Sequence, residues 1–103
     1  MTDMSTDRDP NRCPTHPGEL LREDVLPATG RTKTEIAALL GISRQQLYDI
    51  LREKKPVSAD VAVRLGKLFG NGAGLWLRMQ AAHDAWHAER DVDVSAIPTL
   101  TAA

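Results

Sequence analysis

Apolar residues recur along the chain at intervals of three and four, the spacing of helices that bury one face. Stretches with this spacing cover about residues 17–27, 32–40, 43–51, 58–69 and 75–89. Strand-like alternation occurs only near the C-terminus, at Val92, Val94 and Ile97, where the chain either is mobile or pairs as a lone strand across a dimer. The pattern predicts an all-α domain of five helices with flexible termini.

Residues with known end preferences mark the first and fourth helices. Pro17 suits a first helical position, and Pro27 is expected to end the first helix. Ser58 is a good N-cap for the fourth helix, and Gly70 is a good residue to end it. The predicted organisation is therefore a flexible arm over residues 1–15, a helical domain over 16–90 and a tail over 91–103.

A glycine separates the second and third helices almost without a linker. Thr32 followed by Glu35 forms a capping box, and Ser43 followed by Gln46 repeats it. Gly41 stands between them, where a left-handed residue would cost a side chain about 1–2 kcal/mol. The sequence therefore encodes two short helices at this point in place of one longer helix.

Two short helices joined by a tight turn are typical of the helix-turn-helix of DNA-binding proteins. Ala37 is small where the two helices would cross, and Ile42 can fill the turn. Leu47 and Ile50 would pack the second helix onto the first. Breaking the helix lets the first part cross the phosphates while the N-terminal end of the second enters the major groove.

The stretch 32–51 resembles the phage-repressor-like (Xre/Cro) helix-turn-helix, which has Ala, then Gly four residues on, then an aliphatic residue. The segments HPGELLREDVL (16–26), VSADVAVRLGKLFG (57–70) and WLRMQAAHDAW (76–86) resemble the HigA antitoxins. Trp76, Gln80 and Asp84 match that family's W-L-x-x-Q-x-x-x-D signature, with His83 where an aromatic residue is usual. The resemblance implies a homodimer that binds its own operator and neutralises a HigB/RelE-like toxin that cleaves mRNA.

The outward face of the third helix supplies the candidate base-reading residues. Arginine can fork onto guanine and glutamine onto adenine, and Arg44 and Gln45 occupy the first turn, where the reach is shortest. Tyr48 and Asp49 share this face and either contact DNA or are solvated. Candidate phosphate-binding residues flank them on both helices: Thr32, Lys33, Thr34, Arg52, Lys54 and Lys55.

Charge is unevenly distributed although the formal net charge is only −1. Eight basic and four acidic residues lie between Arg31 and Lys67, which suits a polyanionic partner. The remaining acidic residues are complementary to a basic ribonuclease, so a toxin is expected on the first helix and N-terminal arm or on the last helix. They are Asp3, Asp7, Asp9, Glu19, Glu23, Asp24, Asp84, Glu89, Asp91 and Asp93.

Two histidines one helical turn apart, His83 and His87, imitate the HExxH zinc motif with Asp84 in place of glutamate. A catalytic zinc needs a third protein ligand. Cys13 and His16 lie at the other end of the chain, so no metal site is expected. No nucleophile triad, paired-carboxylate site or glycine-rich phosphate loop is present, and the protein is predicted to be neither an enzyme nor a cofactor binder.

The remaining expectations concern location and partners. A single cysteine, no secretory signal and no long apolar run predict a cytoplasmic protein without membrane contact. Double-stranded operator DNA, a second copy of the chain and a toxin are the expected partners. A stand-alone repressor without a toxin is the alternative, and a protein-binding adaptor is a third reading. Trp76 and Trp86 belong either to the core or to a dimer interface.

Overall fold

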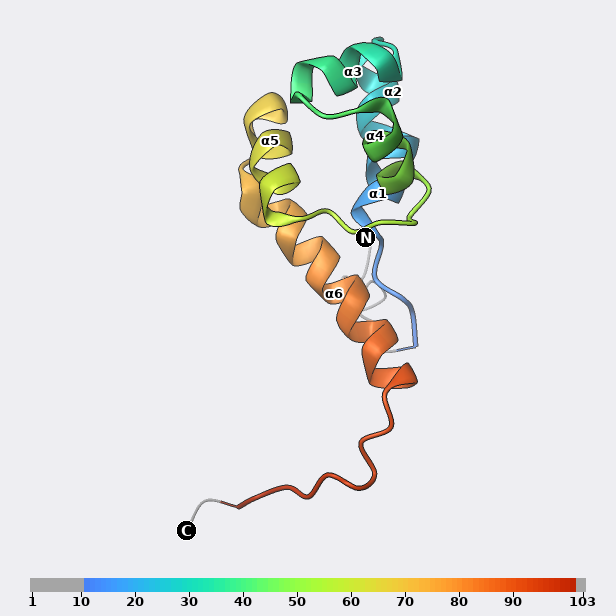
Figure 1. The fold of residues 1–103 in the computed structure, drawn as a ribbon, viewed down its shortest axis with the longest axis vertical. Helices are drawn as coiled ribbons and strands as arrows, with labels where there is room; N and C mark the ends of the chain where they lie inside the picture. The colour runs from blue at the N-terminus through green and yellow to red at the C-terminus, as the bar shows by residue number, and fades with distance from the viewer. Residues whose placement is uncertain (1–10, 102–103) are drawn as a thin grey trace, which may run out of the picture.

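The computed structural model describes residues 11–101, which form helices and loops without any strand (Figure 1). The elements are α1 (Pro17–Leu20), η2 (Leu21–Val25), α2 (Leu26–Thr29), α3 (Lys33–Leu40), α4 (Arg44–Leu51), α5 (Ala59–Phe69) and α6 (Ala73–Asp91). Because α1, η2 and α2 follow one another without a break, they make one helical segment, and the predicted all-α fold of five helices is confirmed. Residues 1–10, with Asp3, Asp7 and Asp9 of the predicted arm, lie outside the described residues.

The first helical segment continues past Pro27, so the prediction that this proline ends it is wrong. A proline inside a helix lacks an N–H and collides with the carbonyl four residues earlier. Here η2 is a π-helix, and the Leu26 N–H bonds to the carbonyl of Leu21, five residues back. The wider turn accommodates the proline, and Gly30, with φ 68°, ends the segment instead.

One apolar core joins all the helices. Its buried members are Leu21, Leu26, Ile36, Ala37, Leu40, Leu47, Ile50, Leu51, Val57, Val61, Ala62, Leu65 and Trp76. Trp76 is completely buried, and its ring N–H donates to Asn71 Oδ1 at 3.0 Å, whereas Trp86 is half-buried beside Arg90. Trp76 is therefore the core tryptophan.

The Gln80 side chain links α6 to the loop that precedes α5 by a hydrogen bond. Its side chain is only 5% exposed, and its Oε1 accepts the Val57 N–H at 2.7 Å. Its Nε2 donates to Asp84 Oδ1 at 2.9 Å. A buried backbone N–H left without such a partner would cost about 1–3 kcal/mol. The glutamine and aspartate of the last-helix signature therefore hold the loop in place.

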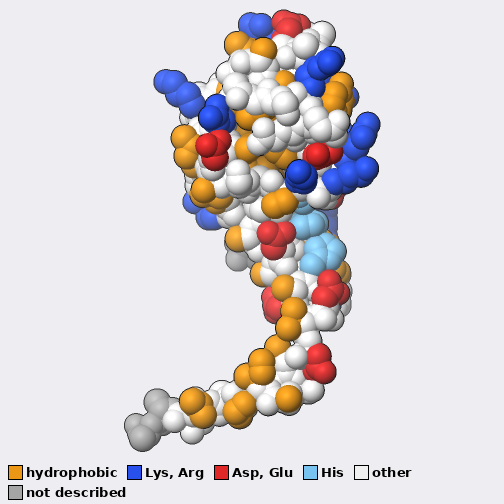
Figure 2. Space-filling view, viewed as in Figure 1, with side chains coloured by type: hydrophobic (Ala, Val, Ile, Leu, Met, Phe, Trp, Pro, Cys, Tyr) orange, Lys and Arg blue, Asp and Glu red, His pale blue; other side chains and the backbone are white. Residues whose placement is uncertain are grey.

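The chain beyond α6 extends away from the helices without regular secondary structure (Figure 1). Its turn is closed by the Ile97 N–H on the Val94 carbonyl at 2.9 Å. Val92, Val94, Ile97 and Leu100 are exposed, and Figure 2 shows hydrophobic side chains along this tail. Among the described residues, no helix combines the length and the apolar composition that crossing a membrane requires.

Candidate nucleic-acid interface

Both predicted helix starts around the turn are capped by side chains. Thr32 Oγ1 accepts the Glu35 N–H, and Glu35 Oε1 accepts the Thr32 N–H, each at 3.1 Å, so the first capping box is confirmed. The Thr32 backbone N–H and hydroxyl donate to the Glu35 carboxylate and lower its pKa. The cap therefore contributes stability above the pKa that Glu35 has in the unfolded chain. This contribution is lost as pH falls through the lowered pKa of the folded state. Ser43 accepts the Gln46 N–H at 3.0 Å, but among the described residues no return bond from the Gln46 side chain completes the second predicted capping box, so that prediction is only half right.

The turn between α3 and α4 has the geometry that the glycine predicts. Gly41 adopts φ 74°, and the Ile42 N–H bonds to the Ala37 carbonyl at 3.1 Å. Arg64 of α5 adds a bond from outside the turn, donating from Nη1 to the Leu40 carbonyl at 2.9 Å while its Nε pairs with Asp60 at 2.6 Å. Arg64 therefore caps the C-terminal end of α3.

Core packing and contacts at its C-terminal end fix α4 in the fold. Its inner residues Leu47, Ile50 and Leu51 are at most 2% exposed. Arg22 of η2 donates from Nη1 to the Leu51 carbonyl at 2.6 Å. Glu53, a non-glycine residue at φ 63°, follows the helix and closes its end with an N–H bond to the Ile50 carbonyl at 3.0 Å. The helix is thus held while its outer face remains exposed.

The first turn of α4 presents Arg44 and Gln45 to solvent. Gln45 Nε2 donates to Asp49 Oδ1, one turn along, at 2.8 Å. An amide group has two N–H donors and one carbonyl acceptor, so one donor and the oxygen remain for a base edge. The structure thus brings two of the predicted base-reading residues together, with Asp49 orienting Gln45.

Tyr48 lies where the two helices of the motif meet. Its ring is half-buried between two cations, with Lys33 Nζ and Arg52 Cζ each 5.7 Å from the ring centroid. Both separations lie within the range of about 6 Å that is typical of cation–π contacts. Tyr48 therefore places a cation from the start of α3 close to one from the end of α4, which the sequence spacing alone does not show.

This arrangement is that of a known family. A sequence profile described as helix-turn-helix matches residues 21–75, more than half of the chain. The chain belongs to the helix-turn-helix family. Virulence-associated protein I of Dichelobacter nodosus is 40% identical over 89 residues, which make up 85% of this chain and 82% of that protein.

Solved structures of similar helix-turn-helix proteins include antitoxins bound to DNA. Antitoxin GraA in complex with its operator has a TM-score of 0.79 and 35% identity, covering 86% of this chain and 93% of that one. Pseudomonas aeruginosa antitoxin HigA with the higBA promoter has a TM-score of 0.70 and 32% identity, covering 78% and 96%. The resemblance to HigA-type antitoxins that the sequence motifs indicate is confirmed.

The candidate phosphate-binding residues differ in whether their side chains already form hydrogen bonds within the protein. The Thr32 hydroxyl donates to Glu35 Oε1 at 3.1 Å, so its proton is already used inside the capping box. The other phosphate candidates have exposed side chains: Lys33, Thr34, Arg52, Lys54 and Lys55. The Lys54 and Lys55 N–H groups bond to the Asp49 carbonyl at 2.8 and 3.2 Å, which fixes the loop that carries both lysines.

A groove of about 470 Å³ runs between α4 and the loop leading to α5. Its lining includes Gln45, Gln46 and Asp49 of α4, and Lys55 and Ser58 of the loop. Sequence reasoning did not anticipate it, because the groove depends on the path of the loop that Gln80 fastens. Lys55 therefore lines the same groove as the predicted base-reading residue Gln45.

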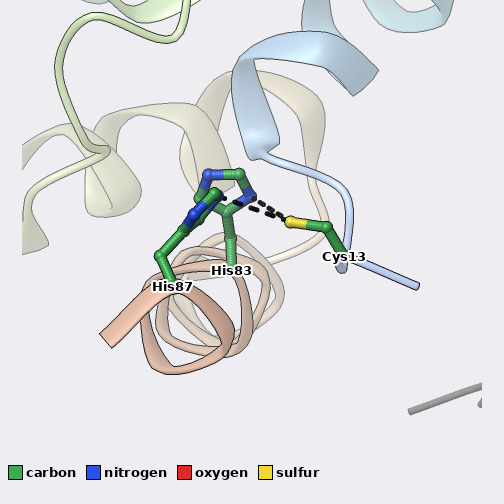
Figure 3. A group of neighbouring side chains, drawn as sticks. All are labelled: Cys13, His83 and His87. Atoms are coloured by element: carbon green, nitrogen blue, oxygen red, sulfur yellow. Dashed lines mark hydrogen bonds between the residues drawn. The ribbon is translucent and has the colours of Figure 1, made fainter. Parts of the chain in front are cut away.

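The reason for expecting no metal site is wrong. Cys13 Sγ lies 3.6 Å from His83 Nδ1 and 3.5 Å from His87 Nε2 (Figure 3). Residues before α1 run back along α6, and the Pro14 carbonyl lies 2.9 Å from His83 Nδ1. The cysteine therefore reaches both histidines although 70 or more positions separate them.

Proposed function

We propose that this protein is a DNA-binding antitoxin that represses its own operon and neutralises a HigB/RelE-like, mRNA-cleaving toxin in the cytoplasm. The observation that carries the DNA-binding part is the first turn of α4, where Arg44 and the Asp49-oriented Gln45 are exposed at the end of a fixed helix. These groups match guanine and adenine edges in the major groove.

The phosphate contacts follow from the same geometry. Lys33 and Arg52 flank Tyr48, and Lys55 borders the groove beside α4, so cations surround the base-reading turn. Figure 2 shows Lys and Arg side chains spread over the upper part of the molecule, which contains these helices. Cations so placed favour DNA of any sequence through counterion release, while base contacts select the operator. GraA and HigA with their operator and promoter support this assignment.

A dimer is expected because one recognition helix reads only a short half-site. Two symmetric copies should place their α4 helices about 34–36 Å apart, one turn of DNA. Sedimentation of the protein alone and with operator DNA measures the number of chains per particle, and the expected result is two chains per operator. The control is an operator with about five base pairs inserted between its half-sites, because this extra half-turn puts the half-sites on opposite faces of the duplex. A monomer on the intact operator would contradict the dimer.

The toxin is proposed to dock on the first helical segment. Glu19, Glu23 and Asp24 have exposed side chains there. A ribonuclease is basic where it holds RNA, so a carboxylate surface is complementary to it. Glu23 pairs with Arg22 at 2.7 Å, but an exposed pair of this kind contributes little to stability. This docking would leave Arg44 exposed for DNA.

Reversing the three charges by Glu19→Lys, Glu23→Lys and Asp24→Lys should weaken toxin binding by about tenfold or more. Growth on co-expression with the toxin of the same operon measures neutralisation, and operator binding should be unchanged. The matched control reverses three carboxylates at the other end, Glu89→Lys, Asp91→Lys and Asp93→Lys. Loss of neutralisation in the control alone would move the contact to α6. If the unaltered protein neutralised nothing, a repressor without a toxin would remain.

A further inference from the structure

The three potential metal ligands Cys13, His83 and His87 converge from two distant parts of the chain (Figure 3). Both histidines project from the same face of α6, and Cys13 projects toward them from the segment before α1. Their ligand atoms all lie within 4.8 Å of one another. Helix-turn-helix geometry does not require this cluster, which lies on α6 and the segment before α1 and not on α3 or α4.

We propose that Cys13, His83 and His87 form a zinc site. Tetrahedral zinc with bonds of about 2.3 Å to sulfur and 2.0–2.1 Å to nitrogen holds sulfur and nitrogen about 3.6 Å apart. The observed separations of Cys13 Sγ from the two histidine nitrogens are 3.6 and 3.5 Å. The two nitrogens must approach to about 3.3 Å, which small side-chain rotations on one helix can provide.

The donor set selects a particular kind of ion. One thiolate and two imidazoles suit zinc, and they suit poorly the oxygen-seeking magnesium or calcium. His83 Nδ1 lies 2.9 Å from the Pro14 carbonyl, so zinc binding replaces that hydrogen bond with a metal bond. A polar hollow of about 240 Å³ adjoins the cluster and is lined in part by Cys13, His16, Glu19 and His83. A water molecule from this hollow completes the four ligands.

The consequence of zinc binding is a cross-link between the two ends of the domain. Cys13 is half-buried and His87 is exposed, so the ion can reach the site from solvent. Bound zinc would tie the segment before α1 to the far half of α6 and add its binding free energy to that contact. The proposal concerns only this contact and stands whether or not the protein neutralises a toxin.

The test uses the full-length, reduced and metal-free protein. Zinc titration against a competing chelator should give one ion per chain, and thermal unfolding should shift to higher temperature. Cobalt, which takes the same geometry, should give a thiolate charge-transfer band and the intense visible bands of tetrahedral coordination. Cys13→Ser should remove the charge-transfer band and weaken zinc binding by about 100-fold or more. His87→Gln, at an exposed position, should weaken it by more than the about 10–100-fold that loss of an outer-shell partner costs, because His87 is itself a proposed ligand.

The matched control is Glu89→Gln, which removes a potential ligand on the same helix outside the cluster. It should leave affinity, stoichiometry and the cobalt spectrum unchanged. Circular dichroism confirms that each variant is folded, and Cys13→Ser keeps the shape of the side chain. The proposal is overturned if zinc binds equally to the unaltered protein and Cys13→Ser, or if cobalt gives only an octahedral spectrum. An affinity loss in Glu89→Gln as large as in His87→Gln would overturn it as well.

Discussion

Arg44→Ala should weaken operator binding by about 1–3 kcal/mol and relax the preference at one base pair. The side chain is exposed on the first turn of α4, and nothing in the core depends on it. Gln45→Ala should have an effect of similar size, because its amide can offer adenine both a donor and an acceptor. Binding to the operator and to operators changed at single positions, at fixed salt, measures both effects.

Lys55→Ala is the comparison that separates base reading from phosphate binding. Lys55 lines the same groove, but it is expected to contact phosphates. Its loss should therefore weaken binding to DNA of all sequences alike, and the dependence of log affinity on log salt concentration should become shallower by about one. Ser58→Ala, in the same groove, does not serve as a control, because Ser58 caps α5. If Arg44→Ala and Gln45→Ala left both affinity and base preference unchanged, α4 would not be the recognition helix.

Local signals in the sequence predicted the parts of the fold that neighbouring residues determine. Thr32 with Glu35, Gly41 and the Ser58 cap act within a few residues, and the structure has all of them in place. The prediction that Pro27 ends the first helix failed because the effect of this proline depends on the π-helical turn before it. Such a turn is rare and has no clear sequence signal. The orientation of Gln45 by Asp49 is also local, and i,i+4 spacing could have indicated it.

Contacts between distant segments could not be predicted in the same way. The cluster of Cys13 with His83 and His87 depends on how the chain before α1 runs along α6. Sequence spacing therefore gave the wrong reason for dismissing a metal site. Gly18 likewise has no local sequence signal for its environment, although the structure buries it against α4.

Gly18 allows a close approach between the first helical segment and the predicted recognition helix. A Cβ built there collides with the Ile50 carbonyl of α4 and comes within 3.1 Å of His16 Nδ1. His16 itself is buried, and its Nδ1 accepts the Gly18 N–H at 2.8 Å. Burial and then the nearby His83 lower the pKa of His16, so the imidazole stays neutral and able to accept this bond.

Gly18→Ala should therefore destabilise the fold by about 3 kcal/mol, at the upper end of overpacking costs, since the neighbour is backbone and cannot rotate away. For a domain of this size the loss corresponds to a fall in Tm of roughly 12–24 °C. The same change should displace α4 and weaken operator binding. Thermal unfolding and operator binding of the variant, measured below its transition, test both effects.

Gly74→Ala provides the matched control, because it makes the same change in another helical glycine. A Cβ at Gly74 meets only the guanidinium of Arg78, the far end of a flexible side chain, with the nearest atom at 2.8 Å. Alanine is the better helix former by up to about 1 kcal/mol, so Tm should stay the same or rise. Equal shifts for Gly18→Ala and Gly74→Ala would show that contact with Ile50 does not limit the side chain at position 18. A normal Tm together with weaker operator binding in Gly18→Ala would mean that α4 moves to relieve the collision without loss of stability.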